Sequence, residues 1–120
     1  MTPQEMFDKA YIGVVKQGCK STDVLGSCLY RGVNDTKCGI GFLIHDDIAK
    51  AWDRRKNNEI TKIKSTKRYP VPKFIVDNIS LAGAIQRAHD EAMDTDFIRD
   101  FKKNMKCVAI AYNLTIPNVE

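Results

Sequence analysis

The segment from Cys28 to Asp47 most constrains the fold, because it interrupts a chain that otherwise shows a helical pattern. It contains half of the four cysteines, three of the seven glycines and one of the two histidines. Two short apolar runs, residues 28–31 and 38–44, flank the sequence Gly-Val-Asn-Asp-Thr-Lys, in which glycine, asparagine and aspartate tolerate a tight reversal of the backbone. This pattern predicts a hairpin of two antiparallel strands.

Gly39 and Gly41 would lie on the same side of the second strand, since the side chains of a strand alternate between its two faces. A face without side chains lets another backbone, a ring or a ligand approach closely. A helix packed over the two glycines would use the same space, and we take this to be the commoner cause of such a pattern.

Amphipathic helices are predicted on both sides of the segment. Thr2, Pro3 and Glu5 form a strong helix start, with Thr2 as the N-cap, and Gly18 ends the same helix. Apolar residues at helical spacing, bounded by capping residues, predict three more helices. The four expected helices cover residues 3–16, 46–56, 80–92 and 97–112.

Residues 59–69 are ambiguous, because apolar and basic side chains alternate there as in an exposed edge strand, while a basic loop fits equally well. No repeat or linker divides the chain. We therefore expect one domain over residues 1–120 of the α+β class. It would be mainly helical, with three or four helices and a small antiparallel hairpin or three-stranded sheet.

Composition places the chain among cytoplasmic proteins. A length of 120 residues can bury a core without disulfides, and 43% hydrophobic with 28% charged residues is ordinary for a globular domain. No apolar run approaches the roughly 18 residues of a membrane span, and the N-terminus lacks the layout of a signal peptide. We expect no contact with a membrane, and the sequence leaves the oligomeric state open.

The cysteines, Cys19, Cys28, Cys38 and Cys107, match no small disulfide scaffold and are expected to be reduced thiols. A metal site would draw on these thiols and on His45. Structural zinc, however, uses pairs about two to four residues apart, and the first three cysteines are separated by nine and ten residues. Neither a metal nor another cofactor is expected.

Charge is distributed unevenly along the chain. Residues 50–73 contain nine lysines and arginines against two acidic residues, whereas residues 77–100 contain six acidic residues against two arginines. Such a bipolar surface can steer an acidic partner, or the two segments can face each other.

A thiol enzyme is one hypothesis. Cys38 as nucleophile, His89 as base and Asp90 or Asp46 as the orienting carboxylate would be the minimum for acyl transfer. Against it, His89 lies on the apolar side of its predicted helix, where histidine more often completes a core hydrogen bond. Cys38 can equally be a small buried residue.

Nucleic-acid binding is a second hypothesis and rests on the basic segment. Trp52 or Tyr69 could stack on bases. The side chains able to meet phosphates are Arg54, Arg55, Lys62, Lys64, Lys67 and Arg68. Against it, the net charge of +4 is low for this role, and lysines on a surface usually serve only to solvate it.

Protein binding is the third hypothesis. Tyr30 and Arg31 are expected to form an exposed pair, and both residue types are favoured at the centres of interfaces. Together with the bipolar charge, this pair gives a protein partner a surface to recognise.

The chain also resembles a group of small, largely uncharacterised proteins of bacteria, prophages and bacteriophages. The likeness lies in Thr-Pro-Gln-Glu-Met-Phe-Asp-Lys at the start, in Cys-Leu-Tyr-Arg-Gly at 28–32, in Lys-Cys-Gly-Ile-Gly-Phe-Leu-Ile at 37–44 and in Ile-Gln-Arg-Ala-His-Asp at 85–90. Val33 and His45 stand where members of that group usually carry proline. The group brings no established activity, so the resemblance implies a setting, mobile genetic elements.

Taken together, these patterns favour a non-enzymatic binding protein. Its expected role is that of a phage or mobile-element accessory factor that binds or inhibits a host protein, in counter-defence or host take-over. A Cys-His thiol-dependent hydrolase and a nucleic-acid-binding protein that uses residues 50–73 are the alternatives.

Overall fold

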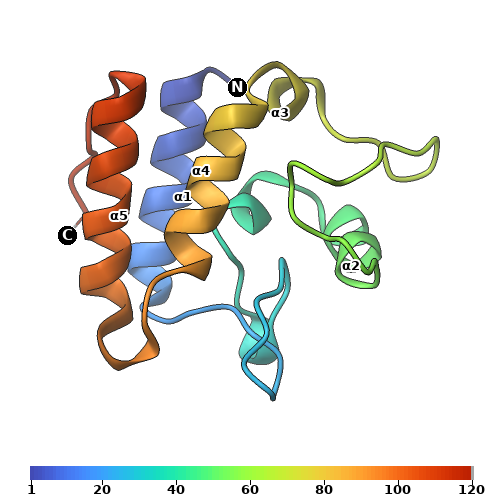
Figure 1. Ribbon diagram of the computed structural model, residues 1–120, viewed down its shortest axis with the longest axis horizontal. Coiled ribbons are helices and arrows are strands. Elements are labelled where there is room, and N and C mark those ends of the chain that lie inside the picture. The colour runs from blue at the N-terminus through green and yellow to red at the C-terminus, as the bar shows by residue number, and fades with distance from the viewer. Residues whose placement is uncertain (120) are drawn as a thin grey trace.

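The computed structural model describes residues 1–119 and is built from helices. Helices α1, α4 and α5 lie side by side, and α2 and α3 lie to the other side of α4 (Figure 1). The described residues form five α-helices: α1 (Pro3–Gln17), α2 (Asp46–Asp53), α3 (Lys73–Asp77), α4 (Ile79–Asp90) and α5 (Phe97–Tyr112). Three short 3-10 helices join them, η1 (Val33–Asp35), η2 (Ile40–Leu43) and η3 (Asp94–Asp96).

The predicted ends of the terminal helices are confirmed. Thr2 and Glu5 form the reciprocal capping box of α1, and Gly18 closes this helix with a left-handed φ of 80°. Asn113 closes α5 in the same way, with φ of 55°. These ends follow from local chemistry, because each residue satisfies backbone groups that the helix leaves without partners.

The predicted hairpin and sheet are wrong, and with them the α+β class. Within residues 1–119 the only strand-like pairings are isolated bridges, Thr22 with Cys28 and Arg31 with Lys37. Residues 40–43 form η2 instead of a strand. The run from 38 to 44 is apolar because every residue in it except the partly exposed Phe42 is buried, and such a short run does not distinguish a strand from a buried helical turn.

The two glycines in this run allow close packing, as expected. A Cβ atom on Gly39 would lie 2.8 Å from the Ile85 side chain of α4, so a helix does pack over this residue. A Cβ atom on Gly41 would lie 2.5 Å from the carbonyl oxygen of Tyr30, so here another stretch of backbone takes the space. Both glycines bring η2 close to the rest of the protein.

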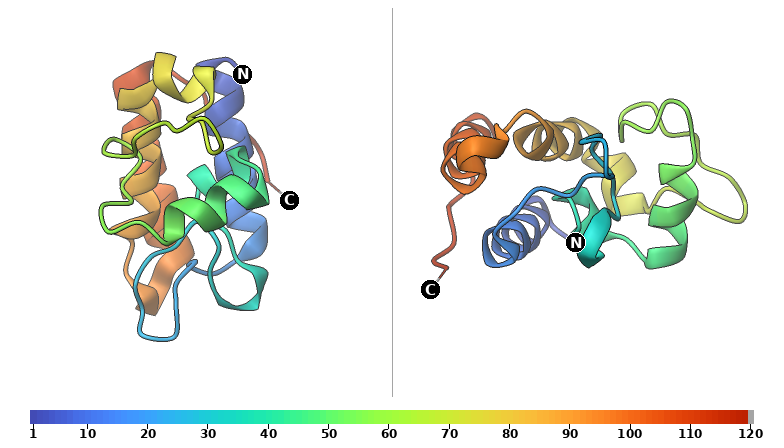
Figure 2. Two further views of the ribbon diagram at one scale, coloured as in Figure 1. Left: turned by 90° about the vertical axis from the view of Figure 1, so that its right-hand side faces the viewer. Right: turned by 90° about the horizontal axis from the view of Figure 1, so that it is seen from below.

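The segment at 59–69 is a loop with turns, so the edge-strand interpretation is wrong. A single hydrophobic core joins the helices to the segments between them, including Phe7, Ile85 and Phe101 from the helical layer and Tyr30 and Trp52 from the α2 side. Views from two other directions show α2 and the loop that follows it lying beside the helical layer (Figure 2). Among the helices of residues 1–119, none has the length and apolar character needed to cross a bilayer.

Candidate functional site

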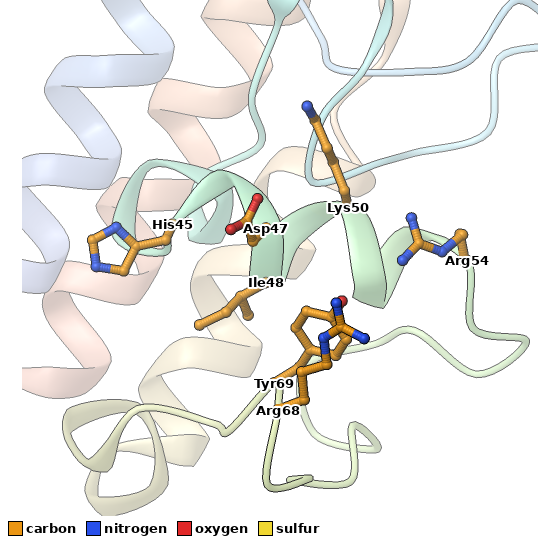
Figure 3. A pocket seen from close by; sticks show the side chains of 7 residues that line it. All are labelled: His45, Asp47, Ile48, Lys50, Arg54, Arg68 and Tyr69. Atoms are coloured by element: carbon orange, nitrogen blue, oxygen red, sulfur yellow. The ribbon is translucent and has the colours of Figure 1, made fainter.

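The candidate site is a groove of about 500 Å³ between α2 and the loop before α3. Figure 3 shows side chains of α2 on one side of the groove and those of Arg68 and Tyr69 on the other. The residues that line it are His45, Asp47, Ile48, Lys50, Arg54, Arg68 and Tyr69. We call this the basic groove.

Helical spacing explains how α2 contributes to the groove. Ala49, Ala51 and Trp52 are buried, which fixes the inward face of this helix. Lys50 and Arg54 lie four residues apart and are exposed on the outward face, so they project on the same side. Both residues line the groove, with the Lys50 side chain directed away from Arg68 and Tyr69 (Figure 3).

The groove carries an excess of positive charge. Within residues 1–119, Lys50, Arg54 and Arg68 form no ion pair, and Asp47 is the only acidic residue in the lining. The guanidinium of Arg68 lies over the ring of Tyr69, 5.5 Å from its centre. Ile48 and the Tyr69 ring add apolar surface, so the groove offers both charge and apolar contact.

Only two of the six predicted phosphate contacts, Arg54 and Arg68, lie in this groove. Arg55 donates a hydrogen bond to the backbone oxygen of Lys64 at 2.5 Å, and Lys62 pairs with Glu59 at 3.7 Å. Lys64 and Lys67 are exposed outside the lining. Of the cations in the basic segment, therefore, only Lys50, Arg54 and Arg68 line the groove.

Only one of the two aromatic residues predicted to stack on bases is accessible. Trp52 is fully buried, so it cannot stack on a base, and its indole Nε1 has no hydrogen-bond partner among the described residues. Tyr69 is half-buried and remains at the groove. The sequence did not lead us to expect His45 and Asp47 in the lining of the groove. The helical spacing of residues 47, 50 and 54 could have indicated that Asp47 shares a face with Lys50 and Arg54.

The prediction that Tyr30 and Arg31 form an exposed pair is wrong. Tyr30 is 2% exposed, and burial raises the pKa of its hydroxyl well above the usual value. Its hydroxyl donates to the backbone oxygen of Asn58 at 2.5 Å and accepts from Gln86 at 3.0 Å. Tyr30 therefore stabilises the interior instead of meeting a partner.

Arg31 holds the loops around η2 together. Its guanidinium donates to the backbone oxygens of Tyr30, Gly41 and Ile44 at 3.0, 2.7 and 2.9 Å. It also donates to the carboxylate of Asp46 at 2.8 Å, and this hydrogen bond holds the pKa of Asp46 below its usual value. These bonds replace the strand pairing that the sequence led us to expect.

Asp53 completes this network from α2. Its two carboxylate oxygens accept the backbone N–H groups of Tyr30 and Arg31 at 2.8 and 3.0 Å. Burial raises the pKa of Asp53, and these two hydrogen bonds oppose the shift. The side chain therefore attaches α2, and with it the basic groove, to the segment at 30–31.

The geometry does not support Cys38, His89 and Asp90 as a catalytic set. Cys38 is 2% exposed, its sulfur accepts the backbone N–H of Gly41 at 3.3 Å, and burial raises the pKa of the thiol. His89 is fully buried, and both of its ring nitrogens are occupied. Nε2 accepts the backbone N–H of Ser21 at 3.0 Å, and Nδ1 lies 2.7 Å from the carboxylate of Asp90.

These bonds also determine the tautomer of His89. Because Nε2 accepts a hydrogen bond, the proton of the neutral ring is on Nδ1 and is donated to Asp90. The ring then has no nitrogen free to take a proton from a thiol. Asp46, the other proposed orienting carboxylate, is exposed and bonded to Arg31.

Cys28, not Cys38, is the cysteine beside His89 and Asp90. The ligand atoms of these three residues lie within 4.8 Å of one another. A metal on Nδ1 would require the proton of the neutral ring to move to Nε2, where it would point at the N–H group of Ser21. Burial, with the negative charge of Asp90, raises the pKa of the Cys28 thiol to about 12, so the group is also not a ready thiolate ligand.

Thiol chemistry should divide the four cysteines into two classes. Cys19 and Cys107 are exposed and should react quickly with a thiol reagent such as DTNB at pH 8. Cys28 and Cys38 should react at least about tenfold more slowly until the protein is unfolded, because their raised pKa keeps them protonated. Time-resolved absorbance with and without denaturant measures this, and a third fast thiol in the folded protein would contradict the account.

Comparison with protein-family models, with curated proteins and with solved structures finds no match for this chain.

Proposed function

We propose that the protein acts by binding, and that its basic groove receives an acidic segment of a partner protein. In the setting implied by the resemblance, it is a phage or mobile-element accessory factor in the host cytoplasm. Its partner there is a host protein that it inhibits or redirects, in counter-defence or host take-over. The observation that carries the proposal is that Lys50, Arg54 and Arg68 line one groove and form no ion pair within residues 1–119.

Two features favour a protein segment over a nucleic acid. Only three cations line the groove, whereas a nucleic acid is held by contacts repeated along its backbone. The groove also combines three cations with the apolar surface of Ile48 and Tyr69, a mixture that suits a peptide with acidic and apolar side chains.

Reversing charge in the groove tests the proposal. A fluorescent peptide of alternating glutamate and leucine serves as the acidic probe. The double variant Arg54→Glu with Arg68→Glu should weaken binding of this peptide by at least about tenfold, because two attractive charges become repulsive. The Kd is measured by fluorescence anisotropy at low protein concentration. The matched control is Lys102→Glu with Lys103→Glu, which changes net charge equally on the exposed side of α5 and should leave the Kd within about twofold.

A single-stranded oligonucleotide provides the second arm of this experiment. If it binds tightly, with a steep salt dependence that the groove variant removes, while the peptide does not bind, the partner is a nucleic acid and the proposal is wrong. Equal loss of peptide binding in the α5 control would show that only net charge matters, which would also contradict it.

A further inference from the structure

The turn from Asp23 to Ser27 presents two adjacent aliphatic side chains to solvent. Val24 and Leu25 are 87% and 90% exposed. This turn forms the lowest point of the molecule in Figure 1, away from the helical layer, and it projects in the same way in the left view of Figure 2. Turns are formed most readily by glycine, proline, asparagine, aspartate and serine, so folding gains nothing from valine and leucine here.

The turn is held in one conformation by its own hydrogen bonds. One carboxylate oxygen of Asp23 accepts the N–H groups of Leu25 and Ser27, both at 2.9 Å. The N–H of Asp23 donates to the backbone oxygen of Ser27 at 2.8 Å, and Gly26 supplies the left-handed φ of 91°. Because the backbone of the turn is already ordered, binding this turn costs little further backbone entropy.

The base of the turn is attached to the core. Thr22 pairs with Cys28 in an isolated bridge, and the N–H of Ser21 donates to the buried ring of His89. The histidine considered for catalysis thus serves to hold this turn against α4. Two exposed aliphatic side chains on a fixed support can enter an apolar pocket of a partner and lose their contact with water there.

The basic groove matches this turn in chemistry. Ile48 and Tyr69 offer apolar surface for Val24 and Leu25, and a volume of about 500 Å³ is sufficient for two aliphatic side chains. The carboxylate of Asp23, next to the two aliphatic residues, brings negative charge toward the three cations of the groove, which outnumber the one carboxylate of Asp47. The turn is thus a protein segment of the acidic and apolar kind that the groove suits.

The turn cannot fill the groove of its own chain, because the turn and α2 lie on separate parts of the surface (Figure 1). We propose that the Val24–Leu25 turn of one copy inserts into the basic groove of a second copy, so that the protein self-associates head to tail. This inference rests on the groove being a binding site, as in the proposed function, and a turn bound there excludes the acidic segment of a host partner from the same groove. A head-to-tail contact leaves one turn and one groove free, so association continues beyond the dimer unless a ring closes.

Sedimentation velocity of the purified protein tests this inference. The average mass of the wild-type protein should rise above that of the monomer between about 10 µM and about 1 mM, the range expected of a small interface. The turn variant, Val24→Ser with Leu25→Ser, and the groove variant, Arg54→Glu with Arg68→Glu, should each remain monomeric. Ile110→Ser is the matched control, because it removes an aliphatic side chain that is 74% exposed on α5, and it should associate as the wild type does.

Mixing the two variants gives the decisive result. The turn variant keeps an intact groove and the groove variant keeps an intact turn, so an equimolar mixture should form a 1:1 dimer and no larger species. A wild-type protein that stays monomeric at all concentrations would overturn the inference, as would a mixture that stays monomeric.

Failure of the self-association can be distinguished from failure of the proposed function. The turn variant should still bind the acidic peptide with an unchanged Kd, because its groove is intact. Peptide binding without self-association would leave the proposed function standing and refute the head-to-tail contact. Self-association that the groove variant retains would refute the contact as well.

Discussion

Replacing Arg31 with alanine should lower the free energy of unfolding by about 2–4 kcal/mol, because partly buried acceptors lose their donor. The guanidinium satisfies three backbone oxygens, one on Tyr30 beside it and two on Gly41 and Ile44 around η2. Arg31→Lys should recover less than half of the loss, since an ammonium group cannot reproduce the planar arrangement of the guanidinium donors. Urea denaturation followed by circular dichroism measures both variants.

Arg99→Ala is the control for this change. Arg99 is 75% exposed and contacts Asp96 and Asp100 only at the surface, so its loss should cost less than about 1 kcal/mol. In the Arg31→Ala variant, the pKa of Asp46 should also return toward its usual value, which a pH titration by NMR would show. Similar stability of the Arg31→Ala and Arg99→Ala variants would contradict the role assigned to Arg31.

Replacing His89 with alanine should have the largest effect on stability, a loss of about 3–5 kcal/mol. The ring is fully buried, packs edge-on against Phe97 at 5.3 Å between ring centres, and accepts the N–H of Ser21. The variant loses this packing and leaves a buried donor without a partner. Thermal and urea denaturation measure the change.

His45→Ala is the matched control, because His45 is exposed at the basic groove and its side chain forms no hydrogen bond or ion pair within residues 1–119. Its loss should change the free energy of unfolding by less than about 0.5 kcal/mol. If His89 acted in catalysis and not in folding, His89→Ala would remain as stable as His45→Ala, and this would contradict its structural role.

Local chemistry made the ends of α1 and α5 predictable, because capping residues act on groups within a few positions of themselves. The segment at 38–44 was not predictable in this way. Its residues are apolar because protein surrounds them, and the bonds that replace strand pairing come from Arg31. Such long-range donors leave no periodic signal in the sequence.

In the candidate site as well, features set by local spacing were predictable and features set by distant contacts were not. The spacing of Lys50 and Arg54 indicates a shared helical face, so part of the basic groove could be read from the sequence. The burial of Tyr30 depends on Asn58 and Gln86, which lie 28 and 56 residues away. Which cysteine lies next to His89 likewise depends on the path of the loop between α1 and η1.

The most direct test of the central claim is an NMR titration of the isotope-labelled protein, kept dilute, with the glutamate-leucine peptide. The chemical shifts of the backbone amides should change at residues 45–54 and 68–69, where the basic groove lies. They should stay constant at the cluster of Cys28, His89 and Asp90. Shift changes centred on that cluster, or none at the groove at saturating peptide, would contradict the central claim.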